Sequence, residues 1–200
     1  MLAVEPDLKP GFVEPVREAQ ETFRAVLHAM AHPGCIMDAG TMLSGPEPLQ
    51  QATLAIGLSL FDFDTPVWLD GTAASPTVES YFRFHTGCAR TALPNCALFG
   101  IISDPAVMPL LQAFDCGTDE APDQSTTLII EVPGLYQNTG GIQLVGPGIK
   151  EKLSILIDGL PNGFWGERAE MNGMFPRGID IIFTAAHRLL ALPRTTKVEC

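Results

Sequence analysis

The sequence predicts an α/β protein in which helices flank a mixed β-sheet. Helical patterns alternate with strand patterns in the first half of the chain, whereas strand patterns follow one another in the second half. Several strand patterns are nearly continuous apolar runs, such as residues 128–130 and 179–183. Burial on both faces of a sheet is the usual cause of such runs, so we expect the sheet to be covered on both sides.

The composition is that of one compact domain, residues 1–200, with residues 1–12 as an N-terminal arm. Hydrophobic residues make up 46% of the chain and charged residues 18%, which is enough apolar material for a core. The formal net charge is -11 and no Lys/Arg run is present, so we expect no nucleic-acid partner. A small anionic ligand remains compatible with this charge, because a pocket can carry its own field.

The cysteines and the N-terminus favour a cytoplasmic location. Five cysteines without paired spacing do not indicate a disulfide framework. The first residues lack the pattern of a signal peptide, and no apolar run reaches the roughly 18 residues of a membrane span. We therefore expect a reduced, soluble, cytoplasmic protein with no membrane partner.

Two helices are predicted in the first third of the chain. The first covers residues 14–31, because Pro15 suits a first helical turn and the tripeptide HPG ends the pattern. Its apolar residues recur at steps of three and four and form one stripe: Val16, Ala19, Phe23, Val26, Leu27 and Met30. The second helix covers residues 48–61 and is apolar nearly all round, so we expect it to be buried.

The middle of the chain predicts alternating strands and helices. The expected order is a strand at residues 65–69, a helix at 76–85, a strand at 96–102 and a helix at 104–114. Ser75 is the expected N-cap of the helix at 76–85. An Asp-Pro pair is the start signal of the helix at 104–114, and Pro109 could shorten it.

The last third predicts mostly strands. Strands are expected at residues 126–132 and 141–146, followed by a helix at 160–170 that contains two glycines. The apolar runs at 179–183 and 189–192 are expected to pair as antiparallel strands inside the sheet. That hairpin would bring the residues before its first strand close to those after its second strand.

Polar residues flank this hairpin and form the first candidate anion site: Arg177, Asp180, Arg194, Thr195 and Thr196, with Lys197 beside them. Two guanidinium groups held together repel by roughly 1–4 kcal/mol, so a fold seldom keeps them without an anion or a carboxylate between them. If Asp180 pairs with an arginine, the cluster is structural, and Arg194→Ala should chiefly lower stability. If the arginines face a cleft, the change should leave folding intact and abolish the function that depends on the bound anion, and this second outcome is our hypothesis.

Arg83 and His85 form the second candidate site, at the end of a predicted helix. A guanidinium group can grip a phosphate or carboxylate with two hydrogen bonds, and a nearby histidine can transfer a proton. The alternative is that both residues only complement the negative end of the helix dipole. The residue pattern leaves both interpretations open.

A metal site is not predicted. His28 and His32 are one helical turn apart with Cys35 nearby, but the glutamate of the metalloprotease motif is absent. Asp62 and Asp64 could hold a cation, although their position at a turn favours plain turn chemistry. We interpret both groups as structural.

Phosphate-loop and nucleophile motifs are also absent. The segment LVGPGIKEK lacks the spacing of a phosphate-binding loop or a dinucleotide fingerprint, so a tight turn is expected there. The chain contains no GxSxG, no CxxC and no lysine in the apolar setting of a Schiff base. The residues therefore predict no cofactor, and they argue against a stand-alone hydrolase.

The chain resembles the PhnH family of the bacterial carbon–phosphorus lyase system along nearly its whole length. The matching segments are FRAVLHAMAHPG, DTPVWL, RFHT, TLII, LVGPGI and, most specifically, the tail FPRGIDIIFTAAHRLLALPRTTKVE. The joint occurrence of these segments in this order carries the resemblance, because each segment alone is weak.

This resemblance implies a subunit of the carbon–phosphorus lyase core complex in phosphonate catabolism. PhnH proteins work with the PhnG, PhnI and PhnJ subunits, form homodimers when isolated, and are needed to form ribose 1-phosphonate 5-triphosphate from ATP and a phosphonate. Their three-layer fold is similar to that of pyridoxal-phosphate transferases, without the cofactor-binding lysine.

The resemblance identifies no catalytic residue, so a binding and assembly role is the leading expectation. A catalytic role for this chain within the complex, in which Arg83, Arg177 and Arg194 hold the anionic nucleotide or phosphonate, is the first alternative. The second alternative is a stand-alone small-molecule enzyme that binds a phosphorylated anion through Arg83, Arg177 and Arg194.

Overall fold

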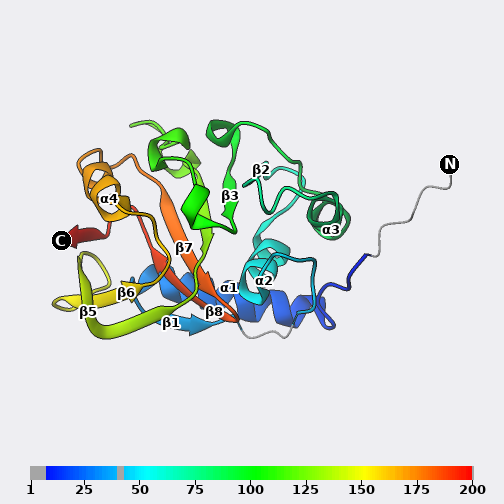
Figure 1. The fold of residues 1–200 in the computed structure, drawn as a ribbon, viewed down its shortest axis with the longest axis horizontal. Helices are drawn as coiled ribbons and strands as arrows, with labels where there is room; N and C mark the ends of the chain where they lie inside the picture. Colours follow the sequence, from blue (N-terminus) through cyan, green and yellow to red (C-terminus); the bar gives the residue numbers. More distant parts are fainter. Residues whose placement is uncertain (1–7, 40–42, 200) are drawn as a thin grey trace.

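The computed structural model describes residues 8–39 and 43–199 (Figure 1). The helices are α1 (Pro15–Ala31), α2 (Gln51–Leu60), α3 (Pro76–Thr86) and α4 (Phe164–Asn172). The strands are β1 (Ile36–Asp38), β2 (Val67–Leu69), β3 (Phe99–Ile102), β4 (Thr127–Glu131), β5 (Leu135–Val145), β6 (Leu153–Ile157), β7 (Asp180–Ala185), β8 (Arg188–Leu192) and β9 (Lys197–Glu199). The predicted α/β class with a mixed sheet and flanking helices is confirmed.

The main sheet has the strand order β1-β8-β7-β4-β3-β2. Strands β2, β3, β4 and β7 run parallel, whereas β8 and β1 join antiparallel at one edge. A second sheet with the order β6-β5-β9 was not predicted as a separate unit. Strands β1, β6 and β9 escaped prediction because they are short or carry a mixture of exposed and buried residues.

The main sheet is covered on both faces, as its apolar strands predicted. Side chains alternate along each strand, so Ile129 and Ile182 pack with helices α1–α3 while Ile130 and Phe183 pack with β5, β6 and α4. Figure 1 shows α4, β5 and β6 on one side of the sheet, with α2 and α3 on the other. The second sheet therefore takes part of the place that the sequence assigned to helices alone.

Helix α1 is confirmed, but only part of its predicted apolar stripe is buried. The buried residues are small or β-branched: Thr22, Ala25, Val26 and Ala29. Val16 is 88% exposed, Phe23 49% and Leu27 57%. Small side chains let the helix lie close to α2 and β8, and this close approach turns the larger side chains toward solvent.

Helices α2 and α3 match their predictions. The middle of α2 is buried, including Leu54 and Ile56. In α3, the Oγ of Ser75 accepts a hydrogen bond from the backbone N of Val78 at 3.3 Å, which confirms the predicted N-cap. Gly87 ends α3 with φ +77, a left-handed conformation that glycine adopts without a steric penalty.

The helix predicted at residues 104–114 is wrong. Two single 3-10 turns, Pro105–Val107 and Leu111–Ala113, occupy this region. Pro109 lacks a backbone N–H, and Met108 before it is extended with ψ 146, as residues before proline prefer. The Asp-Pro start signal is real, since Asp104 Oδ1 accepts from Ala106 N at 3.1 Å, but only one turn follows it.

The C-terminal hairpin is confirmed. Strands β7 and β8 pair antiparallel with Ile181 opposite Leu192 and Thr184 opposite Leu189. Both strands lie inside the main sheet rather than at its edge. Helix α4 is also confirmed, although it begins later than predicted, after Gly163 in a left-handed conformation with φ +91.

Residues 1–7 of the expected N-terminal arm lie outside the described residues. The part of the arm that is described packs on α3, where Tyr81 Oη donates to the carbonyl of Pro10 at 3.3 Å. Within the described part of the chain, no helix has the length and apolar character needed to cross a membrane.

Candidate functional site

The hairpin flanks bring Asp180 and Arg194 together. Asp180 opens β7 and Arg194 follows β8, and the antiparallel register places these two ends side by side. Arg194 Nη2 lies 2.6 Å from Asp180 Oδ2, and Arg194 Nε and backbone N donate to Asp180 Oδ1 at 3.3 and 2.7 Å. The two side chains are only 16% and 18% exposed. This pairing is the arrangement for which we expect a structural role, so the geometry favours that alternative over an open cleft.

The other flanking residues separate from this pair. Arg177 turns to Asp119, with 3.4 Å between Nε and Oδ1, and both side chains are largely exposed. It lines a different pocket, of about 520 Å³, together with Gln112 and Cys116. Thr195 is half-buried and Thr196 is buried. The main-chain carbonyl of Thr196 accepts a hydrogen bond from Asn172 Nδ2 at 2.9 Å, which ties this segment to α4.

A second buried arginine, Arg168, was missed by the sequence analysis. It lies on α4 with no exposed surface, and its Nη2 donates to the carbonyl of Pro193 at 2.6 Å. The pKa of Arg168 is lowered to about 10, chiefly by burial, with the charge of Asp180 opposing this shift and the charge of Arg194 adding to it. Within the described residues, Arg168 Nε and Nη1 and Arg194 Nη1 find no hydrogen-bond partner. Asp180 pairs with Arg194, and its charge also acts on Arg168, an arrangement that only the docking of α4 on the hairpin reveals.

Arg83 and His85 do not form one site. Residues two apart on an α-helix point about 200° apart, so these side chains leave α3 in opposite directions. His85 Nε2 lies 3.1 Å from the carbonyl of Lys9, and its ring packs against Tyr81 and Phe84. His85 therefore holds the N-terminal segment, while Arg83 lines a pocket on the other side.

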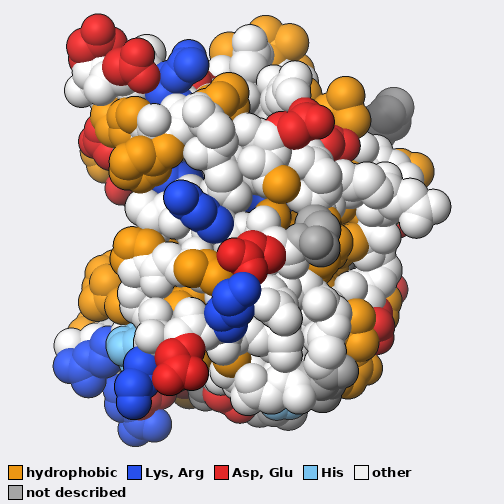
Figure 2. Space-filling model, turned by 90° about the vertical axis from the view of Figure 1, so that its left-hand side faces the viewer, with side chains coloured by type: hydrophobic (Ala, Val, Ile, Leu, Met, Phe, Trp, Pro, Cys, Tyr) orange, Lys and Arg blue, Asp and Glu red, His pale blue; other side chains and the backbone are white. Residues whose placement is uncertain are grey.

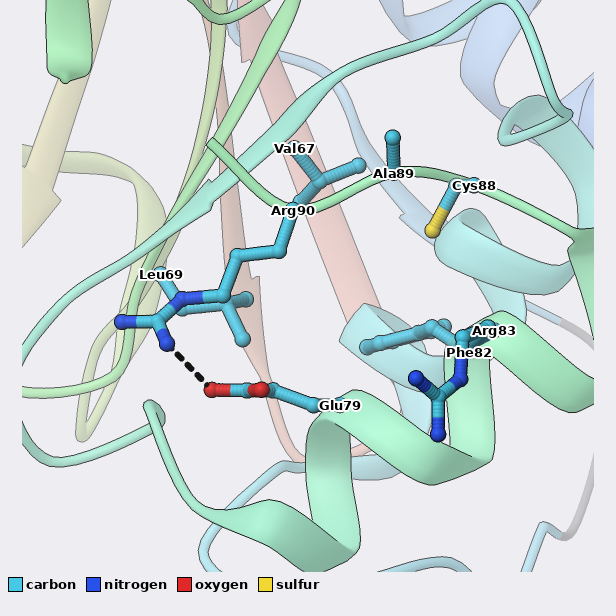
Figure 3. A pocket seen from close by; sticks show the side chains of 8 residues that line it. All are labelled: Val67, Leu69, Glu79, Phe82, Arg83, Cys88, Ala89 and Arg90. Atoms are coloured by element: carbon cyan, nitrogen blue, oxygen red, sulfur yellow. Dashed lines mark ion pairs between the residues drawn. The ribbon is translucent and has the colours of Figure 1, made fainter. Parts of the chain in front are cut away.

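The pocket that Arg83 lines, here called the α3 pocket, is a small amphipathic cavity of about 120 Å³ (Figure 3). Its residues come from β2, α3 and the segment after α3: Val67, Leu69, Glu79, Phe82, Arg83, Cys88, Ala89 and Arg90. Arg90 Nη1 lies 2.6 Å from Glu79 Oε1. Burial raises the pKa of the Cys88 thiol, so this thiol stays neutral and adds no negative charge to the cavity.

Two buried carboxyl groups lie at the carboxyl ends of the parallel strands, where open α/β sheets often bind ligands. Asp70, after β2, accepts from the backbone N of Ala73, Ser103 and Asp104 at 2.7–2.8 Å. Its hydrogen bonds hold the loop after β3, which is a structural role. Glu131 ends β4 and accepts from the backbone N of Gln50 at 2.7 Å, while burial raises its pKa to about 7. A glutamate inside the apolar run TLIIEV was the available signal for this residue.

The motifs judged structural adopt structural geometries. The rings of His28 and His32 stack with centroids 4.2 Å apart, and His32 Nδ1 lies 3.1 Å from the carbonyl of His28. Asp62 Oδ1 accepts from Asp64 N at 2.9 Å, which is a local Asx turn. Across the described residues, no group of three or more His, Cys, Asp or Glu side chains is placed to hold a metal ion.

Charges are mixed on the face that carries α4, β5 and β6. Figure 2 shows positive side chains gathered at the lower left of this face, with acidic side chains beside them and hydrophobic side chains between the charged groups. A nucleic-acid interface is typically a continuous basic stripe. The mixed pattern on this face is unlike such a stripe.

Comparison with known proteins identifies the family. Residues 10–199 match the family of bacterial phosphonate metabolism proteins (PhnH). The chain is 41% identical over 191 residues to the alpha-D-ribose 1-methylphosphonate 5-triphosphate synthase subunit PhnH of Rhizobium meliloti (strain 1021), with 94% of each chain covered. It is 34% identical over 83 residues to HtxG, a candidate C-P lyase subunit protein of Stutzerimonas stutzeri, with 42% of each chain covered. The resemblance seen in the sequence is thereby confirmed, and the chain belongs to the PhnH family of bacterial phosphonate metabolism proteins.

Proposed function

We propose that this chain is a subunit of a carbon–phosphorus lyase complex in phosphonate catabolism, needed to form ribose 1-phosphonate 5-triphosphate from ATP and a phosphonate. The observation that carries the proposal is the 41% identity to a synthase subunit over 94% of both chains. Similarity along the entire fold, rather than at one motif, favours the same role in the same kind of assembly.

Within that complex, the chain contributes binding and assembly. Arg83 and Arg177 line different pockets, and Arg194 is paired with Asp180. The three arginines are therefore engaged at separate places, which gives no support to the stand-alone enzyme that would use all three together. A catalytic contribution would have to come from one pocket alone.

The proposed partners are the PhnG, PhnI and PhnJ subunits, and the proposed location is the cytoplasm. In isolation, the chain is proposed to form a homodimer. The exposed apolar stripe of α1, formed by Val16, Phe23 and Leu27, supports association, because monomers seldom expose contiguous apolar surface. We also propose that the fold is related to that of the pyridoxal-phosphate transferases without the cofactor. The parallel core of the main sheet is compatible with that relation.

Genetic complementation tests the function. A bacterium that lacks its own PhnH subunit should regain growth on methylphosphonate as sole phosphorus source when it expresses this chain. The matched control is the same strain with inorganic phosphate, where growth needs no complex. Failure to grow on methylphosphonate, while the chain accumulates and a PhnH chain from the host restores growth, would contradict the proposal.

Sedimentation tests the association. The isolated chain should sediment as a dimer at micromolar concentration, and Phe23→Ser with Leu27→Ser should shift it toward monomer because the change removes apolar area from the contact. Val107→Ser with Leu110→Ser is the matched control, since these side chains are also exposed, at 66% each, but lie away from α1. Equal effects of the two double variants would argue against the α1 stripe.

A further inference from the structure

We propose that the α3 pocket binds a small oxoanion that carries a short alkyl group, a class that includes alkyl phosphonates. The assignment deepens the proposed function and rests on it only for the choice of probe. The pocket itself is defined by the side chains of α3, β2 and the segment after α3.

The charge arrangement is the first argument. A glutamate four residues before an arginine on a helix normally pairs with it. Here Glu79 instead pairs with Arg90, which reaches the pocket from the other side in Figure 3. Arg83 is left without an ion pair to any described residue, so the two arginines and one glutamate give the lining a net positive charge.

The apolar wall is the second argument. Val67, Leu69 and Phe82 are buried residues of the main core, and they also supply apolar lining to the cavity. A fully hydrated ion such as phosphate gains nothing from such a wall. A ligand with an alkyl group at one end and an oxoanion at the other matches both the wall and the guanidinium group.

A free backbone N–H at the edge of β2 is the third argument. The backbone N of Val67 donates to Ala89 at 2.8 Å, and Thr91 N donates to Val67 at 2.9 Å. The next bond of this ladder would join Leu69 N to Thr91, but it is not formed among the described residues. Because residues two apart on a strand present their backbone groups to the same side, the Leu69 N–H faces this edge and can donate to an anion.

The volume limits the size of the ligand. A cavity of about 120 Å³ has room for several water-sized groups and therefore for a small ligand. Methylphosphonate, with a methyl group on a tetrahedral oxoanion, is of this size. A whole nucleotide is far too large to fit inside the cavity. Only one end of such a molecule could enter, with the rest outside the open side.

Calorimetric titration of the purified full-length chain with methylphosphonate tests the proposal. Arg83→Gln should weaken binding at least tenfold, since it removes a charge-assisted hydrogen-bond donor. Glu79→Gln should tighten binding several-fold, because it removes the negative charge that neutralises Arg90. A structural arginine at a helix end would not produce opposite shifts in these two variants.

Arg24→Gln is the matched control, because it removes the same charge from an exposed position on another helix. Inorganic phosphate should bind more weakly than methylphosphonate, owing to the apolar wall. The proposal is overturned if the wild-type chain binds no methylphosphonate, if Arg24→Gln weakens binding as much as Arg83→Gln, or if phosphate binds equally well.

Ala89→Leu provides a second variant that keeps every charge. It should weaken methylphosphonate binding by filling the cavity, whereas unchanged binding would place the anion elsewhere. Thermal unfolding of each variant shows whether it is folded. The complementation assay is read separately: a wild-type chain that binds methylphosphonate but fails to restore growth contradicts the proposed function and leaves this site intact.

Discussion

Asp180→Ala is expected to lower the free energy of unfolding by about 3 kcal/mol, at the lower end of the range for breaking a buried ion pair. The carboxylate accepts three hydrogen bonds from Arg194 and is the charge that opposes those of Arg168 and Arg194. Its removal leaves two guanidinium groups in a poorly hydrated region without an anion. Urea unfolding followed by circular dichroism measures the loss.

The relative losses of stability in Asp180→Ala and Arg194→Ala show whether the Asp180 carboxylate offsets both arginines or only Arg194. Arg194→Ala should cost less than Asp180→Ala, because Asp180 keeps the hydrogen bond from the backbone of residue 194 and the favourable charge of Arg168. Asp119→Ala is the matched surface control, and its pair with Arg177 should contribute within about 1 kcal/mol. If Arg194→Ala costs as much as Asp180→Ala, the shared-carboxylate explanation is wrong.

Glu131→Gln is expected to raise the free energy of unfolding at pH 8 by up to about 3 kcal/mol. Burial raises the pKa of Glu131 from 4.5 to about 7 in the folded chain, although the hydrogen bond from Gln50 opposes this shift. The folded state therefore keeps a proton that the unfolded state loses. The stability that the folded chain gains by keeping Glu131 protonated is fully present below pH 4.5, falls as the pH rises, and is lost above about pH 7.

The Glu131→Gln variant separates the titration of Glu131 from that of the other acidic residues. A glutamine side chain can still accept the hydrogen bond from Gln50 N, but it does not ionise, so the decline between pH 4.5 and 7 should shrink. Glu170→Gln, at an exposed position on α4, should leave the decline unchanged. A pH profile of Glu131→Gln that superimposes on that of the wild-type chain would refute the role assigned to this carboxyl group.

Local patterns predicted the elements that depend on local physics. The cap at Ser75 and the turn at the end of α1 depend on hydrogen bonds and dihedral angles within a few residues, and both were readable. The hairpin of β7 and β8 was readable because two apolar runs flank a short turn. The helix predicted at residues 104–114 does not form for an equally local reason, since Pro109 lacks a backbone N–H and favours an extended Met108 before it.

The candidate sites depended on contacts that a pattern does not encode. Arg83 and His85 were grouped by their closeness in sequence, but helix geometry sends them to opposite sides of α3. Glu79 lies one helical turn before Arg83 and could have paired with it. Glu79 pairs with Arg90 instead, because the chain after α3 brings Arg90 close to it. Arg168 gave no signal because a charged residue on a ragged helix is usually solvated.

By itself, the sequence determined the family, the α/β class, most of the helices and the central hairpin, because these follow from a continuous match and from periodicity within each element. The tertiary structure alone decided how charges are shared. It paired Asp180 with Arg194 within reach of the charge of Arg168, left Arg83 without an ion pair to any described residue, and buried Glu131 at a strand end. The physical reason is that charge pairing and desolvation depend on distances between elements, and these distances exist only after the layers have packed.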